Sequence, residues 1–481
     1  MRGPAAAFLV LLLVFSLIAI CLLFFPSSSP LSVQFSLNAS PGGAQSSSRL
    51  KIYVAELPRS LNYGLLEKYW SLARADSRIG VDPDEDLRSS LSRASASWGN
   101  GERPVLLPYP ESPLIKQYSA EYWLLGDLEA SPTTRSPSAA AERVARPEDA
   151  DVVFVPFFAT LSAEMELGWG KKGGFGKKEG NDDYARQKEV VDLITSSDAW
   201  NRSGGRDHVF VLTDPVAMWH VRNEIAPAIL LVVDFGGWFK LDDKTSDRGP
   251  SHMVQHNQVS LLKDVIVPYT HLLPKLSLSE DQPRNTLLYF KGAKHRHRGG
   301  LVREKLWDLL VDEPGVVIEE GFPNATGREQ SIKGMRASEF CLHPAGDTPT
   351  SCRLFDAVLS LCIPVVISDQ IELPFEGILD YSEFAIFVSV ADALQQHWLV
   401  DHLRNFTDKQ RHQFRRNMAQ VQSVFEYDSG SARGVGPAPP GSAVEHIWKK
   451  VSQKVPIIRE AVVRGRRKPN GVEIPLRCHC T

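Results

Sequence analysis

Two successive series of short apolar runs, each alternating with helical patterns, constrain the fold of this chain more than any other feature. The first series predicts strands at residues 51–54, 152–155, 208–212, 229–233 and 265–267. The second predicts strands at residues 286–290, 316–318, 339–342, 363–367 and 384–388. Helical spacing occurs at residues 62–74, 115–128, 184–200, 301–311, 329–335 and 353–361. Strands that alternate with helices form mostly parallel sheets, so the pattern predicts an α/β fold with two facing Rossmann-like domains.

The chain has 481 residues, which is long enough for two such domains and further segments. We predict a first domain at residues 50–275, a second at residues 276–430, and a C-terminal helix and tail at residues 431–481. In open α/β sheets ligands bind beyond the carboxyl ends of the strands, so we expect the site in the cleft between the domains. The formal net charge is −3, so we expect no nucleic-acid partner.

A long apolar segment precedes the first domain. Residues 5–25 are apolar apart from Ser16, and a run of this length spans a bilayer core of about 30 Å. We predict a transmembrane signal-anchor there, after a short cytoplasmic tail at residues 1–4. Residues 26–49 are rich in Ser, Pro and Gly and predict a flexible stem. The protein would then be a single-pass type II membrane protein with its body in the lumen.

Sequons and cysteines fit a secretory lumen. Four Asn-x-Ser/Thr sequons are candidate glycosylation sites, at Asn38, Asn201, Asn324 and Asn405. The cysteines Cys341, Cys352 and Cys362 lie close together in the sequence. They predict either one disulfide within the cluster or a set of buried thiols, and the sequence alone leaves both open.

The stretch at residues 338–376 carries the strongest chemical signal. A strand leads into a turn-rich loop at residues 343–350, which contains Gly346, and then into a helix whose first turn holds Ser351 and Arg353. Backbone amides at a helix start attract anions, and Arg353 adds charge-assisted contacts to phosphate oxygens. Asp356 lies on nearly the same helix face and is a candidate to bind ribose hydroxyls. The alternative is an ordinary loop and helix with an Arg353–Asp356 surface salt bridge.

A basic loop follows the first strand of the second series. Lys294, Arg296 and Arg298 gather where that strand ends, and positive charge at this position suits a diphosphate. The alternative is a solvated basic loop. A Gly-x-Gly-x-x-Gly match at residues 168–173 follows no strand directly, and we interpret it as a basic loop beside the acceptor groove rather than a dinucleotide site.

Two ionisable residues at strand ends in the first series are candidate general bases. Histidine as a residue type titrates near neutrality, which makes His208 a candidate, and Asp234 would serve if burial raised its pKa. A structural role is the alternative for each. The Asp-x-Asp motifs at residues 82–84 and 149–151 do not follow a strand, so we expect no metal site.

Several segments together resemble the exostosin family of glycosyltransferases. The matching segments in this chain are Phe-Cys-Leu-His-Pro-Ala-Gly-Asp, Arg-Leu-Phe-Asp-Ala, Ile-Pro-Val-Val-Ile-Ser-Asp, Glu-Leu-Pro-Phe, Phe-Lys-Gly and Gly-Arg-Asp-His. The resemblance covers roughly residues 50–458 and implies a GT-B fold. It implies that Arg296 contacts the diphosphate with Lys294 and Arg298 beside it, and that Glu372 contacts the donor sugar or ribose. One departure is Leu361, where many members carry Gly, and the bulkier side chain predicts altered packing between the helix and the strand.

The resemblance also implies a function. We expect an inverting glycosyltransferase of the Golgi membrane that moves a sugar, arabinose being one candidate, from a UDP-sugar to a cell-wall polysaccharide such as pectic arabinan. No cofactor and no metal are expected, and the expected partners are the UDP-sugar, the polysaccharide, the membrane and a homo- or hetero-oligomer. The alternatives are a non-catalytic scaffold subunit of a polysaccharide synthase and a polysaccharide-binding module.

Overall fold

The computed structural model describes residues 49–75, 107–136, 138–169, 176–234, 260–295, 301–321, 325–346, 348–369, 371–427 and 436–467. Residues 49–481 form one compact unit, and both sheets lie within it. The predicted anchor at residues 5–25 lies outside the described residues, as do Asn38, Asn324, Arg296 and Arg298. Within the described ranges, no helix combines the length and the hydropathy that a membrane crossing requires.

The first sheet contains six parallel strands in the order β2-β1-β3-β4-β5-β6. Its central strands are buried along their whole length, as expected for a parallel sheet covered on both faces. The strands are β1 (Leu50–Val54), β2 (Ala141–Val144), β3 (Val152–Phe154), β4 (His208–Leu212), β5 (Ile229–Val232) and β6 (Val265–Ile266). The helices are α2 (Tyr63–Ala75), α4 (Pro113–Lys116), α5 (Ala120–Glu129), α6 (Ala159–Trp169), α7 (Asp182–Thr195) and α8 (Asp198–Ser203).

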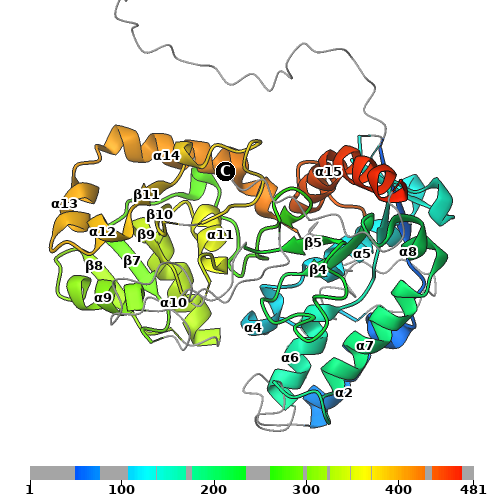
Figure 1. Cartoon of the computed structure of the whole chain (residues 1–481). Helices are drawn as coiled ribbons and strands as arrows, with labels where there is room; N and C mark the ends of the chain where they lie inside the picture. Colours follow the sequence, from blue (N-terminus) through cyan, green and yellow to red (C-terminus); the bar gives the residue numbers. More distant parts are fainter. Residues whose placement is uncertain are drawn as a thin grey trace, which may run out of the picture. The chain divides into compact units, whose positions relative to one another are not determined.

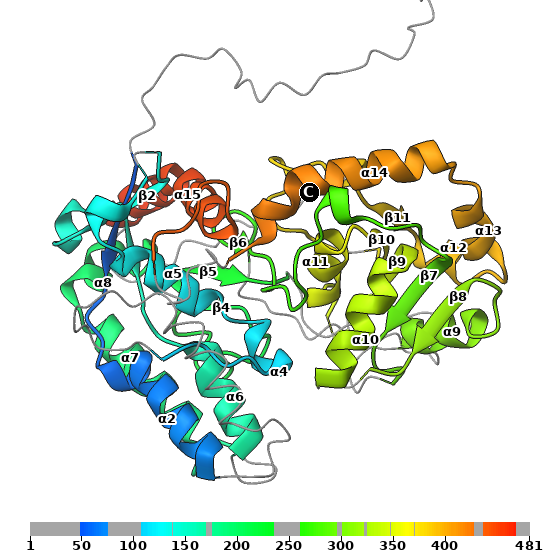
Figure 2. The same ribbon diagram turned by 180° about the vertical axis from the view of Figure 1, so that it is seen from behind.

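The second sheet contains five parallel strands in the order β11-β10-β9-β7-β8. Figures 1 and 2 show these strands beside helices α9 to α14. The strands are β7 (Thr286–Lys291), β8 (Val316–Glu319), β9 (Ser338–Pro344), β10 (Ile363–Ile367) and β11 (Ile386–Val388). The helices are α9 (Leu301–Leu310), α10 (Ala325–Arg336), α11 (Cys352–Leu359), α12 (Val390–Ala393), α13 (Trp398–Arg404), α14 (Asp408–Val421) and α15 (Ala443–Arg466).

The α/β fold with two parallel sheets is confirmed, whereas several helix boundaries are not. The single helix predicted at residues 115–128 is divided into α4 and α5, and the one at residues 184–200 into α7 and α8. Helices α6, α12, α13 and α14 and the edge strand β2 were not predicted. Most of α6 is buried on all sides, so it shows no polar face to mark it as a helix, and β2 has one fully buried residue among its four.

Helix α15, the last helix of the chain, returns to the first sheet. It contacts α5, β1, β2 and β6, and Figures 1 and 2 show it, in red, beside α5. Its apolar face is centred on Trp448, which meets the ring of Phe154 edge-on and donates a hydrogen bond of 3.1 Å from Nε1 to Asp127. Because α15 follows the second sheet in the sequence, the chain crosses between the two halves twice.

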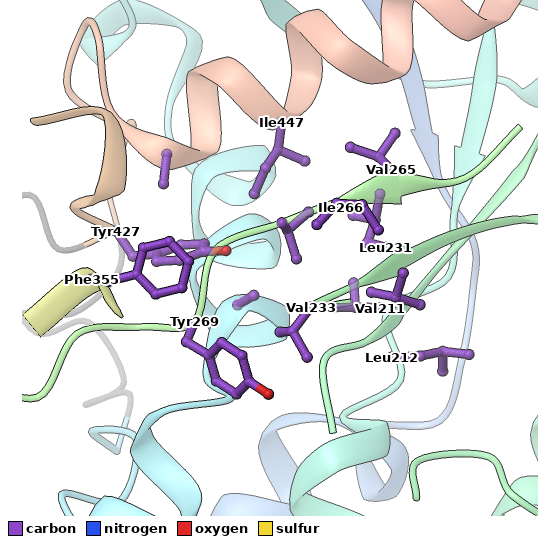
Figure 3. Close-up of a cluster of buried hydrophobic side chains, with 14 of the residues drawn as sticks. Val211, Leu212, Leu231, Val233, Val265, Ile266, Tyr269, Phe355, Tyr427 and Ile447 are labelled. Carbon is purple, nitrogen blue, oxygen red and sulfur yellow. The ribbon is translucent and has the colours of Figure 1, made fainter. Parts of the chain in front are cut away.

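One apolar cluster extends through both halves. Figure 3 shows Val265 and Ile266 of β6 in one buried cluster with Tyr269, and Phe355 of α11 and Tyr427 lie on the Tyr269 side of that cluster. The rings of Tyr269 and Phe355 have centroids 6.2 Å apart. The shared core therefore fixes the end of the first sheet against the start of α11, which carries the residues that the sequence singled out.

The cysteine cluster contains one disulfide. Cys341 of β9 and Cys362, just before β10, are bonded to each other, and Cys352 at the start of α11 is a buried thiol. Of the two alternatives that the sequence left open, the structure therefore has the disulfide. The bond joins two neighbouring strands of the second sheet close to the amino end of β10.

Candidate active site between the two sheets

A cleft of about 580 Å³ lies where the carboxyl ends of both sheets meet. The first half contributes residues that follow β4 and β6, and the second half contributes residues that follow β7, β8 and β9. This is the place where open α/β sheets bind ligands, and the volume suits a small organic ligand. The predicted location of the site is therefore where the structure has its cleft.

Two arginines that lie over the same aromatic ring line the second half's side of the cleft. Arg353 of α11 donates from Nε to the Lys291 carbonyl over 2.7 Å, and its guanidinium lies 5.6 Å from the centre of the Phe290 ring. Arg303 of α9 lies 5.3 Å from the same ring centre. The aromatic ring attracts both cations, which lowers the cost of placing them close together. We call Arg303 and Arg353 the cationic wall; Lys291 also lines the cleft, but its ammonium is paired with Glu319 over 2.9 Å.

Glycines allow these side chains to approach the backbone. A Cβ atom at Gly292 would lie 2.9 Å from Nη2 of Arg353, and one at Gly346 would lie 2.5 Å from Nη2 of Arg303. Any larger residue would displace one of the guanidinium groups. Gly346, a predicted donor-site residue, thus shapes the cleft by leaving room for Arg303, which the sequence analysis had not selected.

The positive charge of this wall helps to lower the pKa of a buried histidine. His343 of β9 is 2% exposed, and its pKa is lowered to about 3 by burial and by the neighbouring Arg353 and Arg303. The imidazole is therefore neutral at physiological pH. Positive charge concentrated on one side of a cleft favours an anionic ligand.

The other predicted donor residues differ in position: one lines the cleft, two lie outside its lining, and two lie outside the described residues. Ser351 lines the cleft at the start of α11, whereas Lys294 is paired with Asp308 over 2.6 Å and is not among the cleft-lining residues. Glu372 interacts with Glu376 and is also absent from the described cleft lining. Arg296 and Arg298 lie outside the described residues, so their predicted contacts remain predictions.

Asp356 lines the cleft but is already engaged. Its Oδ1 accepts hydrogen bonds from the backbone amides of Leu272 and Leu273, over 2.7 and 3.0 Å. Burial raises the pKa of this carboxyl. The residue therefore holds the segment that connects the two sheets against α11, and a ribose contact would have to use its other oxygen.

The structure argues against His208 as the general base. Its side chain is fully buried, lies 5.0 Å from the Trp200 ring and shares a 2.8 Å contact with Asp207. It also begins β4, at the edge of the sheet opposite the cleft. Arg202 and Ser203 donate to Asp207 as well. The Gly-Arg-Asp-His segment thus fixes the entry into β4, and a base buried there has no access to an acceptor.

Asp234 lies at the correct end of its strand but faces the protein. Its carboxylate accepts hydrogen bonds from the Thr348 side chain and the Thr350 backbone, and burial raises its pKa to about 7. Asp234 is not among the cleft-lining residues. These contacts link the end of β5 to the loop before α11, a structural role that the sequence analysis had weighed.

Two carboxyl groups that the sequence analysis did not select are among the residues that line the first half's side of the cleft. Asp214 follows β4 directly and is 3% exposed, and Glu164 lies on α6. Burial and mutual repulsion raise the pKa of Glu164 well above its ordinary value, and burial raises the pKa of Asp214. The rule that selected Asp234, an acid just after a buried strand, would also have found Asp214. Glu164 had no such signal because α6 was not predicted.

Two of the four sequons are described, and both are accessible. Asn201 of α8 and Asn405, which follows α13, are exposed. Leu361 has a φ of 53° and is fully buried, so the residue that replaces the family's frequent Gly adopts a backbone conformation that Gly favours. Among the described residues there is no group of three or more metal-binding side chains.

Comparisons with known proteins place these features in context. The Exostosin GT47 domain matches residues 46–403. The chain is 35% identical over 464 residues to "Probable arabinosyltransferase ARAD1" of Arabidopsis thaliana, covering 95% of this chain and 91% of that protein. It is 26% identical to "Probable beta-1,4-xylosyltransferase IRX10L" of the same species, covering 74% of this chain and 79% of that protein.

Solved structures with some likeness include TarM, at 10% identity and a TM-score of 0.29, with 51% of this chain and 56% of that chain covered. Likeness at that level adds nothing to the argument. The family match extends across both sheets, and the first relative covers nearly the whole chain. The chain therefore belongs to the Exostosin GT47 family and is a glycosyltransferase.

Proposed function

We propose that this protein is an inverting enzyme that transfers arabinose from a UDP-sugar to a cell-wall polysaccharide, with pectic arabinan as the acceptor. The relative named as a probable arabinosyltransferase supports the sugar, since it matches this chain almost end to end. One structural observation supports the donor. Arg303 and Arg353 converge on Phe290 within a cleft at the carboxyl ends of both sheets, where a diphosphate would meet two cations.

In the proposed reaction, the oxygen of an acceptor hydroxyl attacks the anomeric carbon as the bond from that carbon to the diphosphate breaks. Negative charge grows on the departing UDP, and the cationic wall stabilises that charge. Because the guanidinium groups are already held by the Lys291, Ala293 and Pro344 carbonyls, they need little reorganisation during the reaction. Charge supplied by the protein leaves no requirement for a metal ion.

We further propose that the enzyme works in the Golgi lumen, anchored by residues 5–25. The buried Cys341–Cys362 disulfide supports an oxidising compartment, and the exposed Asn201 and Asn405 sequons suit a lumenal body. If the protein enters the lumen and is glycosylated, removal of its N-linked glycans should increase its mobility in gel electrophoresis.

The test is UDP binding followed by transfer. Calorimetry on the full-length protein should show UDP binding that is weakened about 10-fold to 100-fold in Arg353→Ala, because a charge-assisted contact to phosphate is lost. A panel of UDP-sugars should then identify a donor that is consumed equally well with and without a chelator. Lys305→Ala, an exchange of a basic residue of α9 outside the cleft lining, is the matched control. Unchanged UDP binding in Arg353→Ala would remove the diphosphate assignment, and binding without transfer would favour the scaffold alternative.

A further inference from the structure

The carboxyl pair opposite the cationic wall is the strongest feature that the donor site leaves unexplained. Asp214 directly follows β4 and lines the cleft together with Glu164 of α6. Val216 donates its backbone amide to Oδ1 of Asp214 over 2.8 Å, which fixes the carboxyl group in place. Among the described residues, no backbone amide, amine or hydroxyl donates to Oδ2 of Asp214, although it is buried, and Glu164 is the neighbour that forms a side-chain hydrogen bond with this carboxyl. An unpaired carboxylate oxygen at the wall of a cleft costs free energy unless a ligand donates to it.

We propose that Asp214 is the general base that removes the proton from the acceptor hydroxyl, with Glu164 as its positioning residue. This inference rests on the proposed function and completes the reaction described above. The proton of the acceptor hydroxyl passes to the free oxygen of Asp214, and the hydroxyl oxygen forms the new bond to the anomeric carbon. The electrons of the broken bond leave with UDP toward the cationic wall. One wall of the cleft thus accepts the proton, and the opposite wall stabilises the negative charge of the leaving group.

The surroundings of the pair suit this role. Two carboxyl groups in contact do not both ionise readily, so they share one proton, and Glu164 then donates a hydrogen bond to the Asp214 carboxylate. Because each carboxylate oxygen accepts two hydrogen bonds, a lone pair is left for the proton of the acceptor. Arg222, held by the Ala217 and Pro215 carbonyls, supplies the nearby positive charge that favours an ionised Asp214. A base whose pKa is raised toward the working pH accepts a proton more effectively than an ordinary surface carboxylate.

The other ionisable groups around the pair do not compete for the proton. Tyr118 and Tyr269 lie in the same region, and burial raises the pKa of both phenols well above the ordinary value. Tyr109 and Glu121 lie behind the pair, joined by a 3.1 Å hydrogen bond, and Glu121 also accepts the Thr160 and Leu161 amides. Asp234 accepts its hydrogen bonds from Thr348 and Thr350 in the second half. Asp214 is therefore the carboxylate with both cleft access and a free oxygen.

The experiment compares four forms of the full-length protein with the donor and acceptor that give measurable transfer. Asp214→Asn should lower kcat by at least about 100-fold while the acceptor KM and the UDP affinity stay within about threefold. In the unaltered enzyme, kcat/KM should fall at acidic pH as the Asp214 carboxylate gains a proton, and it should fall again at high pH as Glu164 loses its own. Glu164→Gln should remove the high-pH decline, because the amide does not titrate, while retaining most of kcat.

Asp183→Asn is the matched control. Asp183 of α7 is a fully buried carboxyl in the same half, bonded to Ser162 and Gln187 and absent from the cleft lining, so its replacement should leave kcat and both pH limbs unchanged. If Asp214→Asn retained kcat within about threefold, or changed only the acceptor KM, Asp214 would be a binding residue and the inference would be overturned. If Asp214→Asn no longer bound UDP, the pH profile of Glu164→Gln would decide. An enzyme that binds UDP but transfers no sugar would overturn both this inference and the proposed function.

Discussion

Leu361 combines a rare backbone conformation with complete burial. Its φ is 53°, where an L-residue other than Gly is strained by about 1–2 kcal/mol, yet its side chain is fully enclosed between α11 and β10. The strain persists because removing a buried Leu side chain costs more, about 2.7–5 kcal/mol. The sequence analysis anticipated a packing difference at this position, and the structure adds the backbone strain.

A pair of substitutions separates the two effects. Leu361→Ala should lose the side-chain packing and keep the backbone strain. Leu361→Gly should also lose the packing, but it should relieve the backbone strain. We therefore expect both variants to be destabilised, with Leu361→Gly the more stable of the two by about 1 kcal/mol. At Leu306, a buried position inside α9, the order should reverse, since Gly is the poorer helix former. Melting temperatures of the four variants are the measurement. The same order at both positions would refute the strained conformation.

The location of a site residue was predictable when it depended on the order of neighbouring elements in the sequence. Arg353 and Ser351 were predictable because a strand, a loop and a helix start follow one another in the sequence, and local order fixes where their side chains lie. His208 was misplaced because it begins its strand rather than ending it. Arg303 and Asp214 reach the cleft through contacts between elements distant in sequence, which local patterns do not show.

The disulfide Cys341–Cys362 ties strand β9 to the start of strand β10. Cys341 and Cys362 are 21 residues apart in the sequence, and the segment between them contains the whole of α11 with Arg353 and Asp356. A cross-link that closes a loop of this size stabilises a protein by about 3 kcal/mol, mainly by restricting the unfolded chain. The bond therefore supports the strand-loop-helix unit that carries the donor site.

Removing both sulfurs should lower stability without displacing the cleft. We expect the double variant Cys341→Ala with Cys362→Ala to melt several degrees below the unaltered protein and to keep its UDP affinity within about threefold, because neither cysteine lines the cleft. Peptide mapping of the unreduced protein should recover the two residues in one linked pair. A linked pair that contained Cys352 would contradict the pairing, and an unchanged melting temperature would contradict its contribution to stability.

The buried strands were predictable from the sequence, whereas the buried helix α6 was not. The buried strands of both sheets carry runs of Val, Ile and Leu bounded by polar residues, so their positions follow from composition alone. Helix α6 is enclosed on nearly all sides and lacks a polar stripe, so periodicity gave no signal. The omission mattered because α6 carries Glu164.

At the scale of the whole molecule, buried carboxyls join the two halves and surround the cleft. Asp356 holds the connecting segment, and Asp234 reaches the loop before α11. Both act across sequence distances that no local pattern spans, which is why local patterns suggested a base role for Asp234 and a ribose contact for Asp356 and did not show their structural contacts. The same groups give the molecule an unusual dependence on pH.

Stability should fall as the pH rises from about 5 to 8. Burial raises the folded-state pKa of Asp234 to about 7 and that of Asp183 to about 6, from 3.8 in each case. The folded protein therefore binds more protons than the unfolded chain across this range, and by linkage its stability decreases with rising pH. Two groups act in the opposite direction. Asp207, whose pKa is lowered by His208, Ser203 and Arg202 despite burial, does so only below the ordinary Asp range, and His343, whose pKa burial lowers to about 3, does so up to its unfolded pKa of 6.5. Glu121, whose pKa burial raises to about 8, adds to the decline and offsets His343.

The measurement is the melting temperature between pH 5 and pH 8 at fixed ionic strength. Asp234→Asn should show a shallower decline than the unaltered protein, because the amide carries no proton to lose and still accepts from Thr348. Asp192→Asn, at an exposed position on α7, is the control and should follow the unaltered slope. A melting temperature that rose between about pH 7 and pH 8, where His343 is mostly neutral in both states, would mean that the carboxyls are ionised in the folded protein. In that case Asp214 and Glu164 would not share a proton, and the high-pH decline in activity assigned to Glu164 would lose its physical basis.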